Sequence, residues 1–110
     1  DPTSACNLHC TGCWAAEYGH KLNLSYEKLS AIVSQGKELG TYFYMFTGGE
    51  PLVRKKDILR LAEEHHDCEF HCFTNGTLIG GSEARQYLLL PVPGRLRGGQ
   101  RWTPRRGYFR

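Results

Sequence analysis

Three cysteines near the start of the chain have the spacing of a metal-binding loop. Cys6, Cys10 and Cys13 form a C-x3-C-x2-C run, CNLHCTGC. Three thiolates this close in sequence can curl around one metal centre, and Gly12 permits the tight turn between the second and third sulfurs. Three cysteines leave one iron of a [4Fe–4S] cluster without a protein ligand. That open iron could bind a substrate or cofactor directly.

Other interpretations of the same loop stay open. The three thiolates and the imidazole of His9 or His20 could hold zinc in a Cys3His site. The thiols could also be inert, although such tight spacing in a loop has no packing purpose. All five cysteines lie in the first 72 residues, and their odd number and clustering favour a reducing compartment over a secreted disulfide framework.

A second motif follows the cysteines, with Gly48 placed 35 residues after Cys13. In Gly48-Gly49-Glu50-Pro51 the glycines would let the backbone approach a ligand closely, and the carboxylate of Glu50 could pair with an ammonium group. Alone, such a segment is often an ordinary turn. Its position after an apolar stretch and behind the cysteine loop favours a ligand site.

Other polar residues are weaker candidates. Asn75 closes the next apolar run in FTNGT and could meet a ligand, although Asn-Gly is also a common turn that needs no ligand. Arg54, Lys55 and Lys56 are interpreted as a solvated helix start. Structural or solvent-facing roles, not a second metal site, are expected for a group with irregular spacing: His65, His66, Cys68, His71 and Cys72.

The elements that position these motifs can be predicted from the apolar pattern. A helix should begin after Ser25 as N-cap and end at Gly40. Residues 42–46, YFYMF, form a near-continuous apolar run, which is typical of a strand covered on both faces in a parallel sheet. The expected helix carries apolar residues at helical spacing: Leu29, Ile32, Val33 and Leu39.

A second helix is predicted for residues 56–66 and a second strand for residues 69–74. Strands that alternate with helices of this length indicate βαβ crossovers and a parallel sheet. Ligands of such sheets gather at the carboxyl ends of the strands, where both the Gly-Gly-Glu-Pro segment and Asn75 would lie. The fold class expected is therefore α/β.

CNLHCTGC followed by GGEP resembles the radical S-adenosylmethionine (SAM) superfamily, whose signature is C-x3-C-x2-C. The resemblance covers residues 1–79 and implies the N-terminal portion of a partial (β/α)6 barrel. It implies that Cys6, Cys10 and Cys13 hold a [4Fe–4S] cluster. One departure is visible, since the residue before the third cysteine is commonly aromatic in the family and is Gly12 here. Trp14 and Tyr18 could shield the loop instead.

The resemblance also implies that Gly48, Gly49, Glu50 and Asn75 bind SAM, with no catalytic side chain assigned. It implies an enzyme in which the reduced cluster cleaves SAM to a 5′-deoxyadenosyl radical that abstracts hydrogen from a substrate. The substrate is not indicated. The expected partners are SAM, that substrate and an electron donor such as flavodoxin or ferredoxin. An oxygen-sensitive cluster favours a cytoplasmic location.

The charge of the chain divides it at about residue 79. Residues 1–79 carry seven basic and ten acidic side chains, whereas residues 80–110 carry seven arginines and one acid, within a net charge of +3 overall. We expect two parts: a truncated core over residues 1–79, with two helices and two strands, and an Arg/Gly/Pro-rich irregular tail over residues 80–110. The tail could be a disordered basic arm, an out-of-frame continuation or a folded element.

These features set expectations for the chain as a whole. It begins at Asp1 without a leader-like segment, and no stretch is apolar enough to span a membrane. A core this small is marginal, so the isolated chain is expected to fold poorly and to cleave SAM slowly at best. The alternatives are a small zinc- or nucleic-acid-binding module, with nucleic acid disfavoured, and an inactive truncated gene product.

Overall fold

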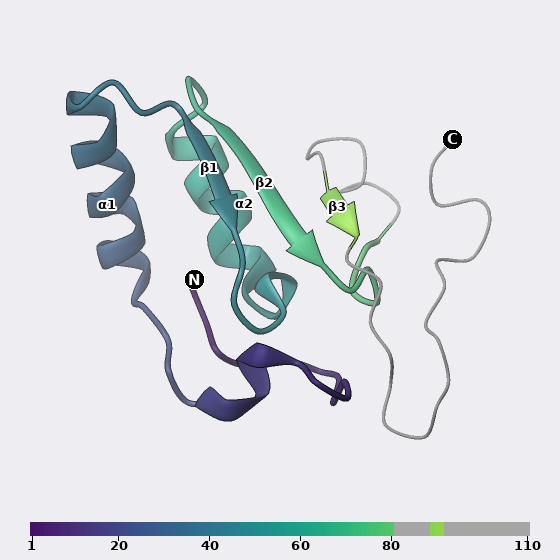
Figure 1. The fold of residues 1–110 in the computed structure, drawn as a ribbon. Helices are drawn as coiled ribbons and strands as arrows, with labels where there is room; N and C mark the ends of the chain where they lie inside the picture. Colours follow the sequence, from purple (N-terminus) through teal and green to yellow (C-terminus); the bar gives the residue numbers. More distant parts are fainter. Residues whose placement is uncertain (81–88, 92–110) are drawn as a thin grey trace.

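The chain forms an α/β structure with a parallel sheet (Figure 1). The computed structural model describes residues 1–80 and 89–91. The sheet order is β1-β2-β3, and both pairings are parallel. The expected α/β class with parallel strands is confirmed. The elements are η1 (Trp14–Tyr18), α1 (Tyr26–Glu38), β1 (Phe43–Phe46), η2 (Pro51–Arg54), α2 (Lys55–Glu64), β2 (Glu69–Thr74) and β3 (Leu89–Pro91).

Helix α1 begins and ends where the sequence predicts. The Ser25 hydroxyl accepts a hydrogen bond from the Lys28 amide at 3.3 Å, which caps the first turn. Gly40 follows the helix with a φ of +83°, the left-handed conformation that glycine adopts without strain. The apolar positions divide unevenly. Leu29 and Val33 are buried, whereas Ile32 is 52% exposed and Leu39 is 86% exposed, so the packed stripe is narrower than the sequence suggests.

Strand β1 pairs with β2 along the whole length of β1, with Phe43 opposite Glu69 and Phe46 opposite Cys72. The predicted strand at residues 69–74 is confirmed. The predicted helix at residues 56–66 corresponds to α2, which begins one residue earlier and ends at Glu64. Strand β3 was not predicted; it pairs with β2 from Cys72 to Thr74.

One face of the β1–β2 pair carries the hydrophobic core. Both helices contribute to this core, so the helices form one layer that packs on the sheet (Figure 1). A side chain on this face alternates with one on the other face along each strand. The buried core residues are Leu29, Val33, Phe46, Leu52, Ile58, Leu61, Phe70 and Cys72.

The opposite face of the sheet is more open than the sequence predicts. Phe43 is 52% exposed and Phe73 is 40% exposed, although the ring of Phe43 contacts that of His71, with centroids 4.6 Å apart. The expectation that residues 42–46 are covered on both faces was therefore wrong for the part of the chain that the structure describes. The helices α1 and α2 share one core with the other face, so the apolar run is covered only there.

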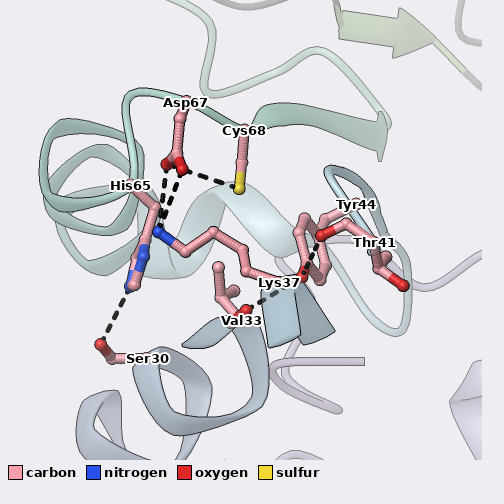
Figure 2. A network of polar contacts seen from close by, with 8 residues as sticks. All are labelled: Ser30, Val33, Lys37, Thr41, Tyr44, His65, Asp67 and Cys68. Carbon is pink, nitrogen blue, oxygen red and sulfur yellow. Dashed lines mark hydrogen bonds and ion pairs between the residues drawn. The ribbon is translucent and has the colours of Figure 1, made fainter. Parts of the chain in front are cut away.

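A polar network ties α1 to the segment that leads into β2 (Figure 2). The ring Nε2 of His65 lies 3.1 Å from the Ser30 hydroxyl, and Lys37 pairs with Asp67 at 3.1 Å. The Tyr44 hydroxyl donates to the Val33 carbonyl at 3.0 Å. These contacts lie where the strands begin, at the opposite end of the sheet from the Gly-Gly-Glu-Pro segment. They fix α1 on the sheet without reaching the cysteine loop.

None of the helices in the described residues is long and apolar enough to cross a membrane. The predicted irregular tail, residues 80–110, lies outside the described residues apart from Gly80 and strand β3.

Candidate functional site

The cysteine loop is closed at its base by a short antiparallel ladder. The Ser4 amide donates to the Leu22 carbonyl at 2.8 Å, and the Leu24 amide donates to the Pro2 carbonyl at 3.1 Å. Thr3 pairs with Asn23 between these two bonds. Residues 2–4 and 22–24 thus form a stem, and the segment between them is a closed loop.

The Arg54 side chain connects this stem to the start of α2. Its guanidinium donates to the carbonyls of Pro2, at 2.9 Å, and of Leu24, so one side chain binds both strands of the stem. It also pairs with Asp57. The expectation that Arg54 belongs to a solvated helix start was wrong. Two carbonyls that face the start of α2 draw the side chain inward, and nothing local in the sequence reveals them.

The glycines of the second motif pack against the stem. A Cβ atom on Gly49 would lie 2.2 Å from the Ala5 carbonyl oxygen, and one on Gly48 would lie 2.5 Å from that of Thr3. The Gly49 amide donates to the Thr3 carbonyl at 3.0 Å, and the Glu50 amide donates to the Ala5 carbonyl at 2.8 Å. The close approach that the glycines allow in this structure is therefore with the segment that leads into Cys6.

The Glu50 side chain is 1% exposed and its carboxylate accepts three hydrogen bonds. Oε1 accepts from the Leu52 amide at 3.0 Å and from the Thr74 hydroxyl at 2.6 Å. Oε2 accepts from the Asn75 amide at 2.7 Å. The carboxylate thus joins the carboxyl ends of β1 and β2 and is fully used within the protein.

The three loop cysteines are free thiols of intermediate burial. Burial, followed by the nearby Cys13 and Cys6 thiols, raises the pKa of the Cys10 thiol. Gly12 has a φ of +74°, as the tight turn requires. Among the residues described, no group of three His, Cys, Asp or Glu side chains is arranged to hold a metal as it stands. The donor set fits an iron–sulfur cluster chemically, because three thiols share one loop and thiolates are the usual protein ligands of such clusters.

Asn75 lies against the cysteine loop. Its side-chain amide donates to the Asn7 oxygen at 2.9 Å and approaches Cys6 Sγ at 3.9 Å. The Asn7 amide donates to the Thr77 hydroxyl at 2.7 Å. The structure thus brings Asn75 beside Cys6, while Asn7 and Thr77 are two further residues that the sequence analysis missed. They are 70 positions apart, so no local pattern could have paired them.

A hollow of about 240 Å³ lies between Gly48-Gly49 and the short helix η1 that follows Cys13. Trp14 and Tyr18 lie at its edge, with their ring centroids 6.3 Å apart and with more than half of each side chain exposed. They are therefore available to cover a ligand, as the sequence interpretation allows. The residues that line the hollow include Trp14, Tyr18, Leu22, Gly48 and Gly49.

Within the loop, His20 Nδ1 accepts from the Cys6 amide at 3.3 Å, whereas His65, Cys68 and Cys72 lie apart from this site. His65 and Cys68 belong to the network at the other end of the sheet. Cys72 packs in the core with Phe70, as predicted. Burial, with a smaller contribution from the charge of Glu50, raises the pKa of the Cys72 thiol to about 12, so it stays protonated and unreactive at neutral pH.

Comparisons with protein-family models and with curated proteins point to the same family. The family model described as the Radical SAM superfamily matches residues 1–90. An uncharacterized protein of Archaeoglobus fulgidus is 38% identical over 88 residues, covering 76% of this chain and 21% of its own. A GTP 3′,8-cyclase of Thermodesulfovibrio yellowstonii is 39% identical over 82 residues, covering 67% of this chain and 26% of its own.

An AdoMet-dependent heme synthase of Oleidesulfovibrio alaskensis is 33% identical over 88 residues, covering 76% of this chain and 22% of its own. The chain therefore spans about a quarter of the length of the curated relatives it matches, or less. No solved structure matches it.

Proposed function

The chain belongs to the radical SAM superfamily, and we propose that its cysteine loop holds a [4Fe–4S] cluster to which SAM binds. Cys6, Cys10 and Cys13 would be the three protein ligands. When bound and reduced, the cluster supplies the electron that cleaves SAM to a 5′-deoxyadenosyl radical for hydrogen abstraction. The observation that carries the proposal is the contact between the loop and the carboxyl ends of β1 and β2, through Ala5–Glu50 and Asn7–Asn75.

The remaining site residues divide into two proposed roles. Gly48 and Gly49 would present backbone polar groups to the amino and carboxylate groups of SAM, while Asn75 borders the same space. Glu50 would keep its place in the set by positioning this segment, since its carboxylate accepts three hydrogen bonds and its backbone amide and carbonyl bond to Ala5 and Val53. Trp14 and Tyr18 would limit the access of water from the loop side.

The proposed partners follow from this chemistry. An electron donor of the flavodoxin or ferredoxin kind would reduce the cluster, and a reducing, cytoplasmic location suits it. The names of the relatives indicate two reaction types, GTP cyclisation and heme synthesis, and neither is assigned to this chain. The described part of the sheet is open on one face, so we expect the 110-residue chain alone to turn over SAM slowly.

Anaerobic reconstitution tests the proposal. With iron and sulfide, the chain should take up about four irons and absorb near 400 nm, and reduction with SAM should yield 5′-deoxyadenosine, even if slowly. The changes Cys6→Ala, Cys10→Ala and Cys13→Ala should each abolish the cluster.

The matched control is Cys68→Ala, which removes a thiol at the other end of the sheet and should leave iron uptake unchanged. Binding of a single zinc ion in place of iron and sulfide would contradict the proposal, as would a cluster that survives all three loop substitutions.

A further inference from the structure

Three side chains form a closed ring of hydrogen bonds between the cysteine loop and the turn after β2. The Thr77 hydroxyl donates to Asn75 Oδ1 at 2.7 Å, Asn75 Nδ2 donates to Asn7 Oδ1 at 2.9 Å, and Asn7 Nδ2 donates to the Thr77 hydroxyl at 2.7 Å. Each group in the ring both donates and accepts. Asn7, Asn75 and Thr77 are hereafter called the amide ring.

The amide ring fixes which way the Asn75 side chain points. The Thr77 backbone amide, which can only donate, lies 3.0 Å from Asn75 Oδ1. The oxygen therefore faces the turn, and Nδ2 must face the loop. There Nδ2 approaches Cys6 Sγ at 3.9 Å, within range of a weak N–H···S contact. The Leu8 amide is a second donor to the same sulfur, at 3.4 Å.

The ring also supplies a fixed point that the loop otherwise lacks. The stem holds the loop at residues 2–4 and 22–24, and Glu50 holds residue 5 through its backbone amide. Asn7 is the next residue beyond Cys6 and is joined to the carboxyl end of β2 across 70 positions of sequence. A long-range contact at this point restricts where Cys6 can lie relative to the strand ends.

We infer that Asn7 and Thr77 are positioning residues that hold Cys6 beside the strand ends and aim the Asn75 amide at its sulfur. The inference rests on the proposed function for its consequence, since Cys6 is there a cluster ligand. A donor aimed at a ligating sulfur stabilises the reduced cluster, because it offsets negative charge on that sulfur. The amide ring would thus set both the retention of iron and the reduction potential.

Substitution of Thr77 provides a matched pair. Thr77→Val keeps the shape but removes the hydroxyl, whereas Thr77→Ser keeps the hydroxyl. In the reconstituted 110-residue chain, Thr77→Val should lose iron to a chelator about 10-fold faster than the unchanged chain, and Thr77→Ser should stay within about twofold. The reduction potential, measured by titration with electron paramagnetic resonance, should become more negative for Thr77→Val alone.

A double substitution tests whether the side chains act as one unit. Asn7→Leu should match Thr77→Val, and the two together should be no worse than either alone, because the ring is broken once. Thr41→Val is the control, since Thr41 precedes β1 at the opposite end of the strand. Multiplied losses in the double variant, or a Thr77→Val variant equal to the unchanged chain, would overturn the inference.

A measurement without metal separates this inference from the proposed function. In the metal-free chain, hydrogen exchange of the amides of residues 6–13 should be faster in Thr77→Val than in Thr77→Ser. If the unchanged chain binds no iron–sulfur cluster, the proposed function fails, yet this comparison still tests the ring. Equal exchange in the two variants would overturn the positioning role whatever the loop binds.

Discussion

The Glu50 carboxylate has a role at residue scale that its place in the GGEP motif does not reveal. From sequence it was interpreted as a partner for a ligand ammonium group. In the structure it lies buried between the ends of β1 and β2 and accepts from the Leu52 amide, the Thr74 hydroxyl and the Asn75 amide. A buried carboxylate with three donors has a structural role. Loss of its hydrogen bonds would weaken the connection between the ends of β1 and β2, next to the candidate site.

Replacement of Glu50 should measure how much these hydrogen bonds contribute to the free energy of unfolding. Glu50→Gln turns one oxygen into an amide donor that must face another donor, so the free energy of unfolding should fall by about 1–3 kcal/mol. Urea unfolding followed by circular dichroism gives the value. Glu63→Gln, on an exposed position of α2, should change it by less than about 0.5 kcal/mol. Equal stability of the two variants would contradict the structural role.

Single residues also define what the sequence could reveal. The proposed cysteine ligands, Gly12 and the two strand-end motifs follow from type and spacing, which are local properties. The inward turn of Arg54 and the pairing of Asn7 with Thr77 depend on which distant backbone or side chain lies opposite. Such partners are fixed only by the completed fold, so local pattern could not predict them.

At the scale of elements, the turn after β1 and the loop stem form one unit. The backbone of Gly48 and Gly49 passes so close to residues 3–5 that no side chain fits between them. This packing fixes the position of residues 3–5, which lead into the cysteine loop, relative to the turn after β1. The glycines were predicted to allow the close approach of a ligand. The structure shows that they allow the close approach of residues 3–5.

A methyl group at Gly49 should therefore displace the loop. Gly49→Ala would force the Ala5 carbonyl away, so we expect a loss of about 1–3 kcal/mol in unfolding free energy and reduced iron uptake on reconstitution. Gly40→Ala is the control, because its positive φ costs about 1 kcal/mol without any clash near the loop. The expectation fails if the Gly49 variant takes up iron as well as the Gly40 variant.

Elements were the part of the fold that the sequence predicted best. The capping by Ser25, the glycine stop at Gly40 and the strand at residues 69–74 follow from local chemistry and are confirmed. The covering of residues 42–46 was wrong, because an apolar run does not say how many layers pack on it. Strand β3 was missed, since its short apolar run sits in a segment dominated by Gly, Pro and Arg.

At the scale of the whole molecule, a small core and a bound centre should depend on each other. The core joins two helices to one face of a three-stranded sheet, while the other face leaves Phe43 and Phe73 exposed. A core of this size gives a marginal free energy of unfolding. Binding of the proposed cluster by three cysteines that are spread apart in the unfolded chain would add to that free energy.

Cluster assembly should raise the unfolding temperature of the chain. If the cluster binds only the folded state, and its components are present well above the dissociation constant, we expect the unfolding temperature to rise by roughly 10 °C or more. Anaerobic thermal unfolding before and after reconstitution measures it. The Cys10→Ala variant, which lacks one ligand, should show no rise. An unchanged midpoint for the unsubstituted chain would contradict the coupling of binding to folding.

The stem described at the base of the cysteine loop has a consequence for how this segment can change. Its bonds join residues 2–4 to 22–24, and none of them involves a residue between. Residues 5–7 of the enclosed segment are also held, by Glu50 and by the amide ring, so the part left to change lies after Cys13. Insertions between Cys13 and Leu22 would alter its outline, while the register of β1 and β2 stays the same. Variation in the surroundings of the cysteines can therefore proceed without a redesign of the sheet beneath them.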